Sequence, residues 1–346
     1  MAGRQCPDPP VHLLAAVVRR PTAPAAATDP QMNDPIKIGT RGSKLALWQA
    51  GWVKSILEKK FPPTPIELVI IKTQGDKILD VPLAKVGGKG LFVKEIEQAL
   101  LARRIDIAVH SMKDMPAEIP QGLCIGAVPK RENPLDVFIS RSGTGFNELA
   151  GGSVIGTSSL RRSAQLRHAR PDMVIRPIRG NLDTRLKKLD SENFDALVLA
   201  AAGVKRLNLE HRITEYLDPE LILPAIGQGA LCIEIRKEDS IVSPLVSSLD
   251  HAPTRAAVAG ERTFLNRLEG GCQVPIAGYG RISGNQFVLT GLVAAIDGAR
   301  LVKGEKSGPL DSAETIGIQL AEELLARGAD KILEKLKAIP PEGYES

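Results

Sequence analysis

Short apolar strands alternate with amphipathic helices along most of this 346-residue chain. The first pair is a strand at 36–39 and a helix that Ser43 can cap, with apolar residues at helical spacing up to Ile56. Further strands are expected at 66–71, which looks buried, and at 105–109, with a second helical stripe between them. Strands that alternate with helices in this way predict an α/β fold in which helices cover parallel sheets.

The same alternation returns in a second set of elements. Strands are expected at 137–140, 154–157, 174–178 and 195–199, and a late strand at 231–235 could return to the first sheet. We therefore expect two similar domains with crossing connections, because a single open sheet of all these strands would be unusually wide. The expected boundaries are 35–130 plus 230–248 for domain 1 and 131–229 for domain 2.

A third, smaller α/β domain is expected at 249–346. An amphipathic helix is followed there by strands at 276–282 and 287–293. The closing helix is expected to start at Asp311, with Glu314 completing a capping box.

Residues 1–34 are expected to form a disordered extension, since they are rich in Pro and Ala and show no periodicity. Two arginines and a proline follow the apolar run 11–18, where a secretory cleavage site would stand. No serine precedes Ser43, which argues against a transit peptide. Met32 lies directly before the first strand and could be an alternative start.

The composition narrows the class of partner. A net charge of +5 suggests an anionic partner, either nucleic acid or a small polycarboxylate or phosphate. Aromatic residues make up only 3% of the chain, so the stacking platforms that bind single-stranded nucleic acids are scarce. The four cysteines form no C-x-x-C pair, which disfavours a disulfide framework or thiolate zinc site and suits a reducing cytosol. No apolar run approaches the roughly 18 residues of a membrane-spanning helix.

Polar and cationic residues follow four of the expected strands, which is where open α/β sheets bind ligands. Hydroxyls at a helix N-terminus and guanidinium groups suit carboxylate or phosphate. For one arginine, a solvated helix face explains the charge equally well, but four such strand ends together favour an anion-binding site. The residues concerned are Thr40, Arg41 and Ser43; Lys113 and Asp114; Thr157, Ser159, Arg161 and Arg162; and Arg179 and Arg185.

Several further features allow two interpretations. Cys272 follows two glycines, so it is either a small buried residue on a turn or a nucleophile or attachment point. Lys85 and Lys89 lie on a glycine-rich loop that lacks the P-loop spacing and could close over an anionic site. His110 lies at a strand end, and a histidine in that position is more often structural than catalytic. Asp114 would stay charged among the cations and could stabilise a cation on a bound substrate.

Taken in order, eight runs of this chain resemble the porphobilinogen deaminase (hydroxymethylbilane synthase) family. The resemblance extends from Ile36 to about Lys337, and so many separate runs in register make it specific. The runs are 38–46, 72–76, 87–95, 108–116, 155–165, 178–181, 227–231 and 270–276.

The resemblance implies a fold, a reaction and a cofactor. The first two domains would be similar to type II periplasmic binding proteins, and the third would carry Cys272. The enzyme would be a transferase of haem biosynthesis that joins four porphobilinogen units head to tail, with loss of ammonia, to give hydroxymethylbilane. Cys272 would hold a dipyrromethane cofactor through a thioether, and Asp114 would be the catalytic carboxylate. The residues implied to bind cofactor or substrate are Arg41, Ser43, Lys85, Lys89, Lys113, Thr157, Ser159, Arg161, Arg162, Arg179, Arg185 and Arg206.

Two other classes of protein fit part of the pattern. A periplasmic binding protein would share the two-domain fold, but it needs an export signal and has no use for a third domain with Cys272. A nucleic-acid binder would fit the positive charge, but its arginines should form a basic face instead of gathering at strand ends. We therefore expect a monomeric cytoplasmic enzyme that binds porphobilinogen and neither nucleic acid, membrane nor metal.

Overall fold

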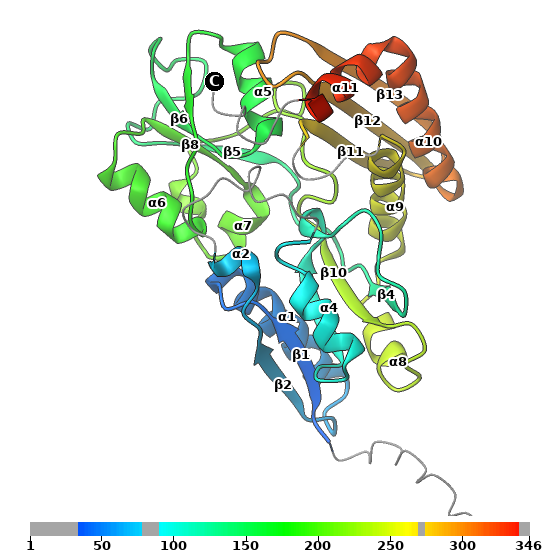
Figure 1. The fold of residues 1–346 in the computed structure, drawn as a ribbon. Coiled ribbons are helices and arrows are strands. Elements are labelled where there is room, and N and C mark those ends of the chain that lie inside the picture. The colour runs from blue at the N-terminus through cyan, green and yellow to red at the C-terminus, as the bar shows by residue number, and fades with distance from the viewer. Residues whose placement is uncertain (1–33, 78–89, 269–273, 339–346) are drawn as a thin grey trace, which may run out of the picture. The chain divides into compact units, whose positions relative to one another are not determined.

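Three β-sheets and the helices packed on them make up the computed structural model, which describes residues 34–77, 90–268 and 274–338 (Figure 1). Within these ranges, no helix has the length and apolar character needed to cross a membrane. The expected extension before residue 34 lies outside the described residues, as do Lys85, Lys89 and Cys272.

The first sheet has the strand order β2-β1-β3-β10-β4. β1 pairs in parallel with β2 and β3, whereas β10 is antiparallel to both β3 and β4. The predicted return of the strand near 231–235 to the first sheet is therefore confirmed, but the sheet is mixed and not parallel. The strands are β1 (Ile36–Thr40), β2 (Ile66–Ile70), β3 (Ile107–Ser111), β4 (Leu123–Ala127) and β10 (Leu231–Arg236).

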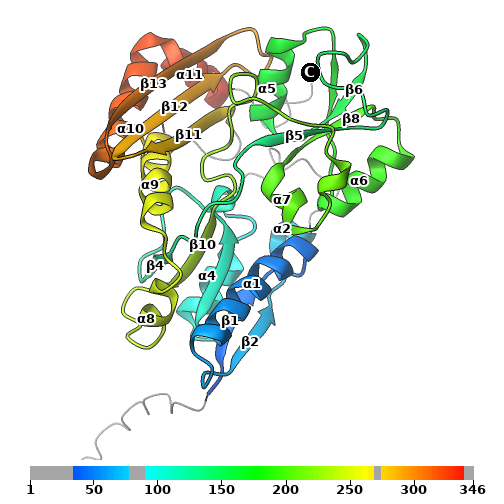
Figure 2. The same cartoon turned by 180° about the vertical axis from the view of Figure 1, so that it is seen from behind.

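The second sheet repeats this arrangement in the order β7-β6-β8-β5-β9, with β5 antiparallel to β8. β5 thus takes the position that β10 takes in the first sheet, and the chain enters each of them on crossing from the other sheet (Figure 2). The two crossings contact each other, since the Glu132 backbone N–H donates to the Gly229 carbonyl at 3.2 Å. The strands are β5 (Asp136–Ser140), β6 (Val154–Gly156), β7 (Val174–Arg176), β8 (Ala196–Ala200) and β9 (Glu215–Tyr216).

Side-chain caps define where the helices of these two sheets begin. Ser43 caps α1 by accepting a hydrogen bond from the Ala46 N–H at 3.3 Å, as predicted, and Ser159 and Asn181 cap α5 and α6. The helices and 3₁₀ turns are α1 (Lys44–Lys60), α2 (Gln74–Lys77), α4 (Lys94–Leu101), η1 (Met112–Asp114), α5 (Leu160–Ala169), α6 (Leu182–Ser191), α7 (Ala201–Arg206), η2 (Glu210–Arg212) and α8 (Val242–Ser247).

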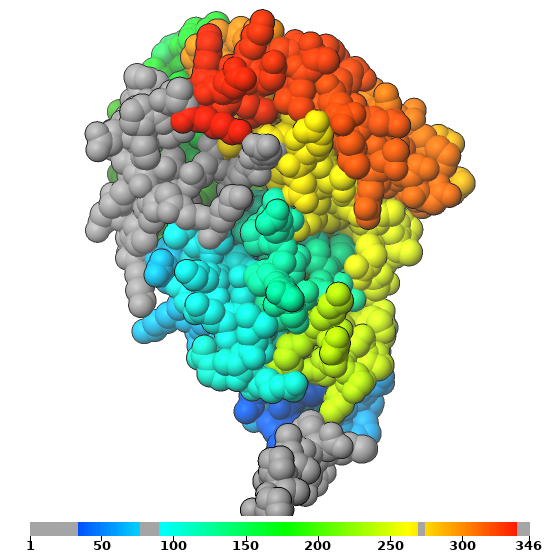
Figure 3. Space-filling view, turned by 45° about the vertical axis from the view of Figure 1, so that its right-hand side comes forward, coloured from blue at the N-terminus to red at the C-terminus, as the bar shows by residue number. Residues whose placement is uncertain are grey.

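The third sheet is antiparallel, in the order β11-β12-β13, and α9 and α10 pack on it around the buried Phe264, Phe287 and Leu320. α9 also contacts the segment that connects η1 to β4 of the first sheet, because Arg262 donates to the carbonyl of Pro116 at 2.9 Å. Figure 3 shows α9, in yellow, against that segment. The elements are α9 (Ala252–Arg267), β11 (Ile276–Ser283), β12 (Gln286–Ala294), β13 (Leu301–Pro309), η3 (Leu310–Ser312), α10 (Ala313–Leu324), the π-helical turn η4 (Leu325–Ala329) and α11 (Asp330–Ala338).

Two predictions of local structure are wrong. The strand at 66–71 is not buried: β2 is an edge strand, and Ile70 is 58% exposed. Asp311 does not cap the closing helix, because it lies inside the 3₁₀ turn η3 and α10 begins only at Ala313, after Ser312. Within the described ranges, the division into three domains with the expected boundaries stays a prediction.

Candidate active site

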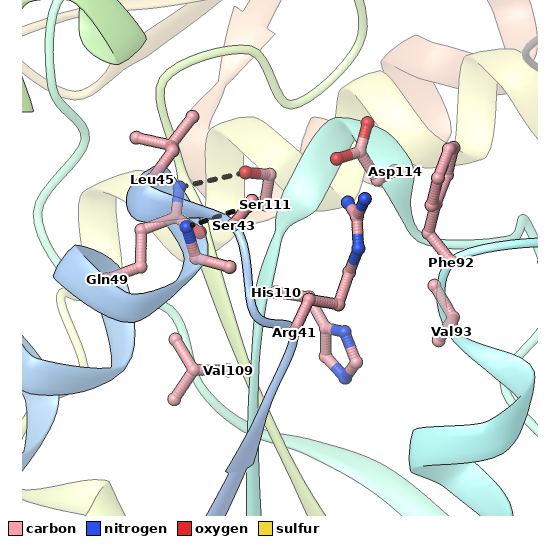
Figure 4. Close-up of a pocket in the computed structure, with 11 residues that line it drawn as sticks. Arg41, Ser43, Leu45, Gln49, Phe92, Val93, Val109, His110, Ser111 and Asp114 are labelled. Atoms are coloured by element: carbon pink, nitrogen blue, oxygen red, sulfur yellow. Dashed lines mark hydrogen bonds between the residues drawn. The ribbon is translucent and has the colours of Figure 1, made fainter. Parts of the chain in front are cut away.

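A pocket lies at the edge of the first sheet where β1 and β3 end. β1 and β3 are parallel, so the residues after both strands meet at this edge. Figure 4 shows the Arg41 guanidinium extended toward Asp114, with the His110 ring on the opposite side of Arg41. The lining residues are Arg41, Ser43, Leu45, Ala46, Gln49, Phe92, Val93, Val109, His110, Ser111 and Asp114.

Arg41 is held in place from two sides. Its Nε donates to Asp76 Oδ1 at 3.1 Å, and its guanidinium carbon lies 4.1 Å from the centre of the Phe92 ring. Thr73 Oγ1 donates to the other Asp76 oxygen at 2.8 Å. Burial opposes ionisation of Asp76, but the hydrogen bonds from Arg41 and Thr73 lower its pKa overall. A charged Asp76 therefore fixes the direction of the Arg41 side chain.

Lys113 and Asp114 belong to η1, which directly follows β3. Burial is the main reason that the pKa of Lys113 falls to about 8. The charge of Asp114 opposes this shift, and that of Arg162 adds to it. Arg162 lies on α5 of the second sheet, so cations from both sheets are close enough for their charges to interact. An ion pair of 3.1 Å between Lys44 and Asp183 also joins the starts of α1 and α6.

Four of the expected binding residues surround the start of α5. Thr157 is buried, and its hydroxyl accepts a hydrogen bond from the Ser159 N–H at 3.2 Å. Arg161 and Arg162 are also buried, and both donate to Asp136, a residue to which the sequence pattern assigned no role. Asp136 could have been noticed as a single acid at the start of an otherwise apolar strand.

The remaining arginines divide into two groups. Arg185 has a pKa lowered to about 10, first by burial and then by the charges of Arg162 and Arg179, with Asp114 opposing. Arg179 and Arg185 therefore belong to the same cationic region as Lys113 and Asp114. Arg206 has other partners: it donates to the Gly229 carbonyl at 2.8 Å, and its guanidinium is 5.9 Å from the Trp48 ring centre.

His110 belongs to a buried cluster of ionisable groups. Its Nε2 lies 3.2 Å from Glu234 Oε2, and both side chains are buried. Burial and the charge of Glu234 raise the pKa of the nearby Glu97 to about 7. In the described residues, no group of three or more His, Cys, Asp or Glu side chains could hold a metal ion.

A cationic region around Asp114, at the strand ends of two mixed sheets, defines an α/β protein suited to a polyanionic ligand. Two family models cover most of the chain: "Porphobilinogen deaminase, dipyromethane cofactor binding domain" matches residues 36–243, and "Porphobilinogen deaminase, C-terminal domain" matches residues 256–326. The chain belongs to the porphobilinogen deaminase family.

The chain is far more similar in sequence to curated relatives than to the solved structures it matches. The porphobilinogen deaminase of Pelobacter propionicus is 56% identical over 301 residues, which is 87% of this chain and 97% of the relative. That of Geobacter metallireducens is 57% identical over 298 residues, or 86% and 93% of the two chains. The solved methionine binding protein MetQ is a distant match, 14% identical over 62% of this chain and 89% of its own, with a TM-score of 0.40.

Proposed function

We propose that this chain is a transferase that joins four porphobilinogen units head to tail, with loss of ammonia, to give hydroxymethylbilane. Family membership carries this proposal, and the site supports it chemically. Each pyrrole unit brings an acetate and a propionate group. A site rich in arginine and lysine matches such a series of carboxylates.

Asp114 is proposed as the catalytic carboxylate. Loss of ammonia from the aminomethyl group of porphobilinogen leaves positive charge on the pyrrole. A fixed carboxylate opposes that charge without having to reorganise. Arg41, which is already held by Asp76 and Phe92, would orient a substrate carboxylate beside Asp114. The same carboxylate can accept pyrrole N–H hydrogen bonds and so align the reacting rings.

The donor set also suits a dipyrromethane, which carries the same carboxylate groups as the substrate. Held through Cys272, this cofactor would supply the pyrrole to which the first substrate unit is joined. The residues of this chain proposed to hold its carboxylates and those of the substrate are Arg41, Ser43, Lys85, Lys89, Lys113, Thr157, Ser159, Arg161, Arg162, Arg179, Arg185 and Arg206.

Incubation of the purified chain with porphobilinogen tests the proposed reaction. We expect release of one ammonia for each porphobilinogen consumed, and uroporphyrin after oxidation of the product. A reaction mixture without the protein is the control. If porphobilinogen binds but no ammonia appears, the chain binds this ligand without being a transferase.

A pH prediction follows from the low pKa of Lys113, which is about 8. A lysine binds a carboxylate only when protonated, so the affinity of the free site should fall as the pH rises through 8, by up to about tenfold per pH unit. The KM for porphobilinogen should therefore rise above pH 8 in the wild type. It should stay flatter in Lys113→Arg, because arginine remains charged.

Titration of the substrate itself affects KM equally in both proteins, so any difference between their pH profiles comes from residue 113. Identical pH profiles of KM in the wild type and Lys113→Arg would contradict the assignment of Lys113 to carboxylate binding.

The same low pKa also means that protonated Lys113 destabilises the fold at neutral pH. That destabilisation disappears between pH 8 and the ordinary lysine value of 10.5.

We propose further that the enzyme acts as a monomer in the cytoplasm. Cys124 and Cys232 carry free thiols, which suits a reducing compartment. Light scattering on the purified chain tests the oligomeric state, and fractionation of the source cells tests the location.

A further inference from the structure

Asp136, the first residue of β5, is a fully buried carboxylate with four hydrogen bonds. Its Oδ2 accepts from Arg161 Nη1 at 2.7 Å. Its Oδ1 accepts from Arg162 Nη2 at 2.6 Å, from Arg162 Nε at 3.0 Å and from Gln228 Nε2 at 2.9 Å. Burial opposes ionisation, but the charges of Arg161 and Arg162 hold the pKa of Asp136 well below its usual range. Asp136 is therefore a permanent anion that contacts both arginines.

The contacts to Asp136 leave part of each guanidinium available. Arg161 Nη1 also donates to the Leu223 carbonyl at 2.6 Å, and Arg162 Nη1 donates to the Val198 carbonyl at 3.0 Å. Both of these contacts of Arg161 use Nη1, and its Nε and Nη2 take no part in them. A planar guanidinium fixed at one edge presents its remaining N–H groups in a defined direction.

The charges of Arg161 and Arg162 influence residues of the site that contains Asp114. The charges of Arg161 and Arg162 both lower the pKa of Lys113, and the charge of Arg162 lowers that of Arg185. Two arginines and one aspartate leave a net positive charge in this buried group. The group can therefore still attract an anion, although one of its charges is already neutralised.

We propose that Asp136 is a positioning residue for substrate binding. It orients Arg161 and Arg162 so that their remaining N–H groups meet the carboxylates of porphobilinogen and of the dipyrromethane. This inference rests on the proposed function, in which the two arginines bind those carboxylates. Asp136 itself is fully buried, and it contacts the two arginines and not the ligand.

The test compares Asp136→Asn with Glu261→Gln, a matched change at another buried acid. Glu261 is also fully buried and holds one guanidinium, that of Arg131, with its Oε1 at 2.5 Å from Nη1. Arg131 is not among the proposed carboxylate-binding residues. Both variants should therefore lose thermal stability, since Asp136→Asn leaves two buried guanidinium groups and Glu261→Gln one half-buried guanidinium without a counterion.

Only Asp136→Asn should change ligand affinity. We expect its KM for porphobilinogen and its Kd measured by calorimetry to rise about tenfold or more, while kcat changes less than about threefold. Intact mass should show lower occupancy by the dipyrromethane. In Glu261→Gln, KM, Kd and occupancy should match the wild type.

Unchanged KM and Kd in Asp136→Asn would overturn the inference, and so would an equal rise of both in Glu261→Gln. If Asp136→Asn does not fold, Gln228→Leu takes its place, because it removes one hydrogen bond to Asp136 and keeps both ion pairs. A rise in Kd of about threefold supports the inference, and an unchanged Kd overturns it. A wild-type chain that neither binds nor converts porphobilinogen would count against the proposed function and remove the inference with it.

Discussion

Replacing Asp114 with asparagine is expected to lower kcat by roughly 10²–10⁴, the range typical for the loss of one electrostatic or acid–base group. Asparagine keeps the shape of the side chain but removes the charge that opposes the positive pyrrole. The fold should remain intact, because Asp114 lines an open pocket where water and salt screen the remaining cations. KM should change less than kcat, since the arginines and lysines that hold the carboxylates are still present.

Steady-state kinetics on Asp114→Asn, with cofactor occupancy checked by intact mass, makes the measurement. Glu118→Gln is a matched control, because Glu118 is an exposed acid four residues further along the chain and should have wild-type kinetics. A near wild-type kcat in fully occupied Asp114→Asn would show that the role of Asp114 is wrongly assigned. His110, 3.2 Å from Glu234 in the same sheet, would then be the next residue to examine.

Features that depend on neighbouring residues could be predicted from the sequence. The Ser43 cap is set by a hydroxyl and an N–H three residues apart, and the strand–helix alternation follows from local apolar periodicity. The meeting of Arg41 and Asp114 in one pocket follows from the parallel pairing of β1 and β3. Local pattern and sheet geometry together were sufficient for this part of the site.

Features that depend on distant residues could not be predicted. The apolar run of β2 looks like a core strand, and only its place at the sheet edge explains why Ile70 is exposed. The direction of β10 and β5 depends on how the chain crosses between the sheets, which no local pattern encodes. Near the C-terminal end of the described residues, Asp311 lies inside a 3₁₀ turn, so it cannot cap the helix that contains Glu314.

The candidate site shows the same division. The sequence predicts that Arg161 and Arg162 bind carboxylates of a ligand. In the structure, both form ion pairs with Asp136 of the same chain. Asp136 precedes them by 25 and 26 residues and lies on another element, so their pairing is a tertiary contact. The pairing of His110 with Glu234, across 124 residues, is another. Contacts of this kind appear only when the sheets are assembled.

Replacing Cys272 with serine is expected to abolish both the covalent cofactor and the activity. A thiolate can form the proposed thioether, whereas a serine hydroxyl is a far weaker nucleophile at neutral pH. The intact mass of the purified wild type should exceed the sequence mass by one dipyrromethane, and that increment should be absent from Cys272→Ser. Mass spectrometry reports this outcome independently of any activity assay.

Cys124→Ser is the matched control, because Cys124 and Cys232, the cysteines that the structure describes, are poor candidates for the attachment. Burial raises the pKa of Cys124, and it raises that of the fully buried Cys232 far more, so neither readily forms a thiolate. Cys124→Ser should therefore keep the mass increment and the wild-type rate. A full increment in Cys272→Ser would place the cofactor on another residue. An unmodified mass in fully active wild type would show that no covalent cofactor is needed.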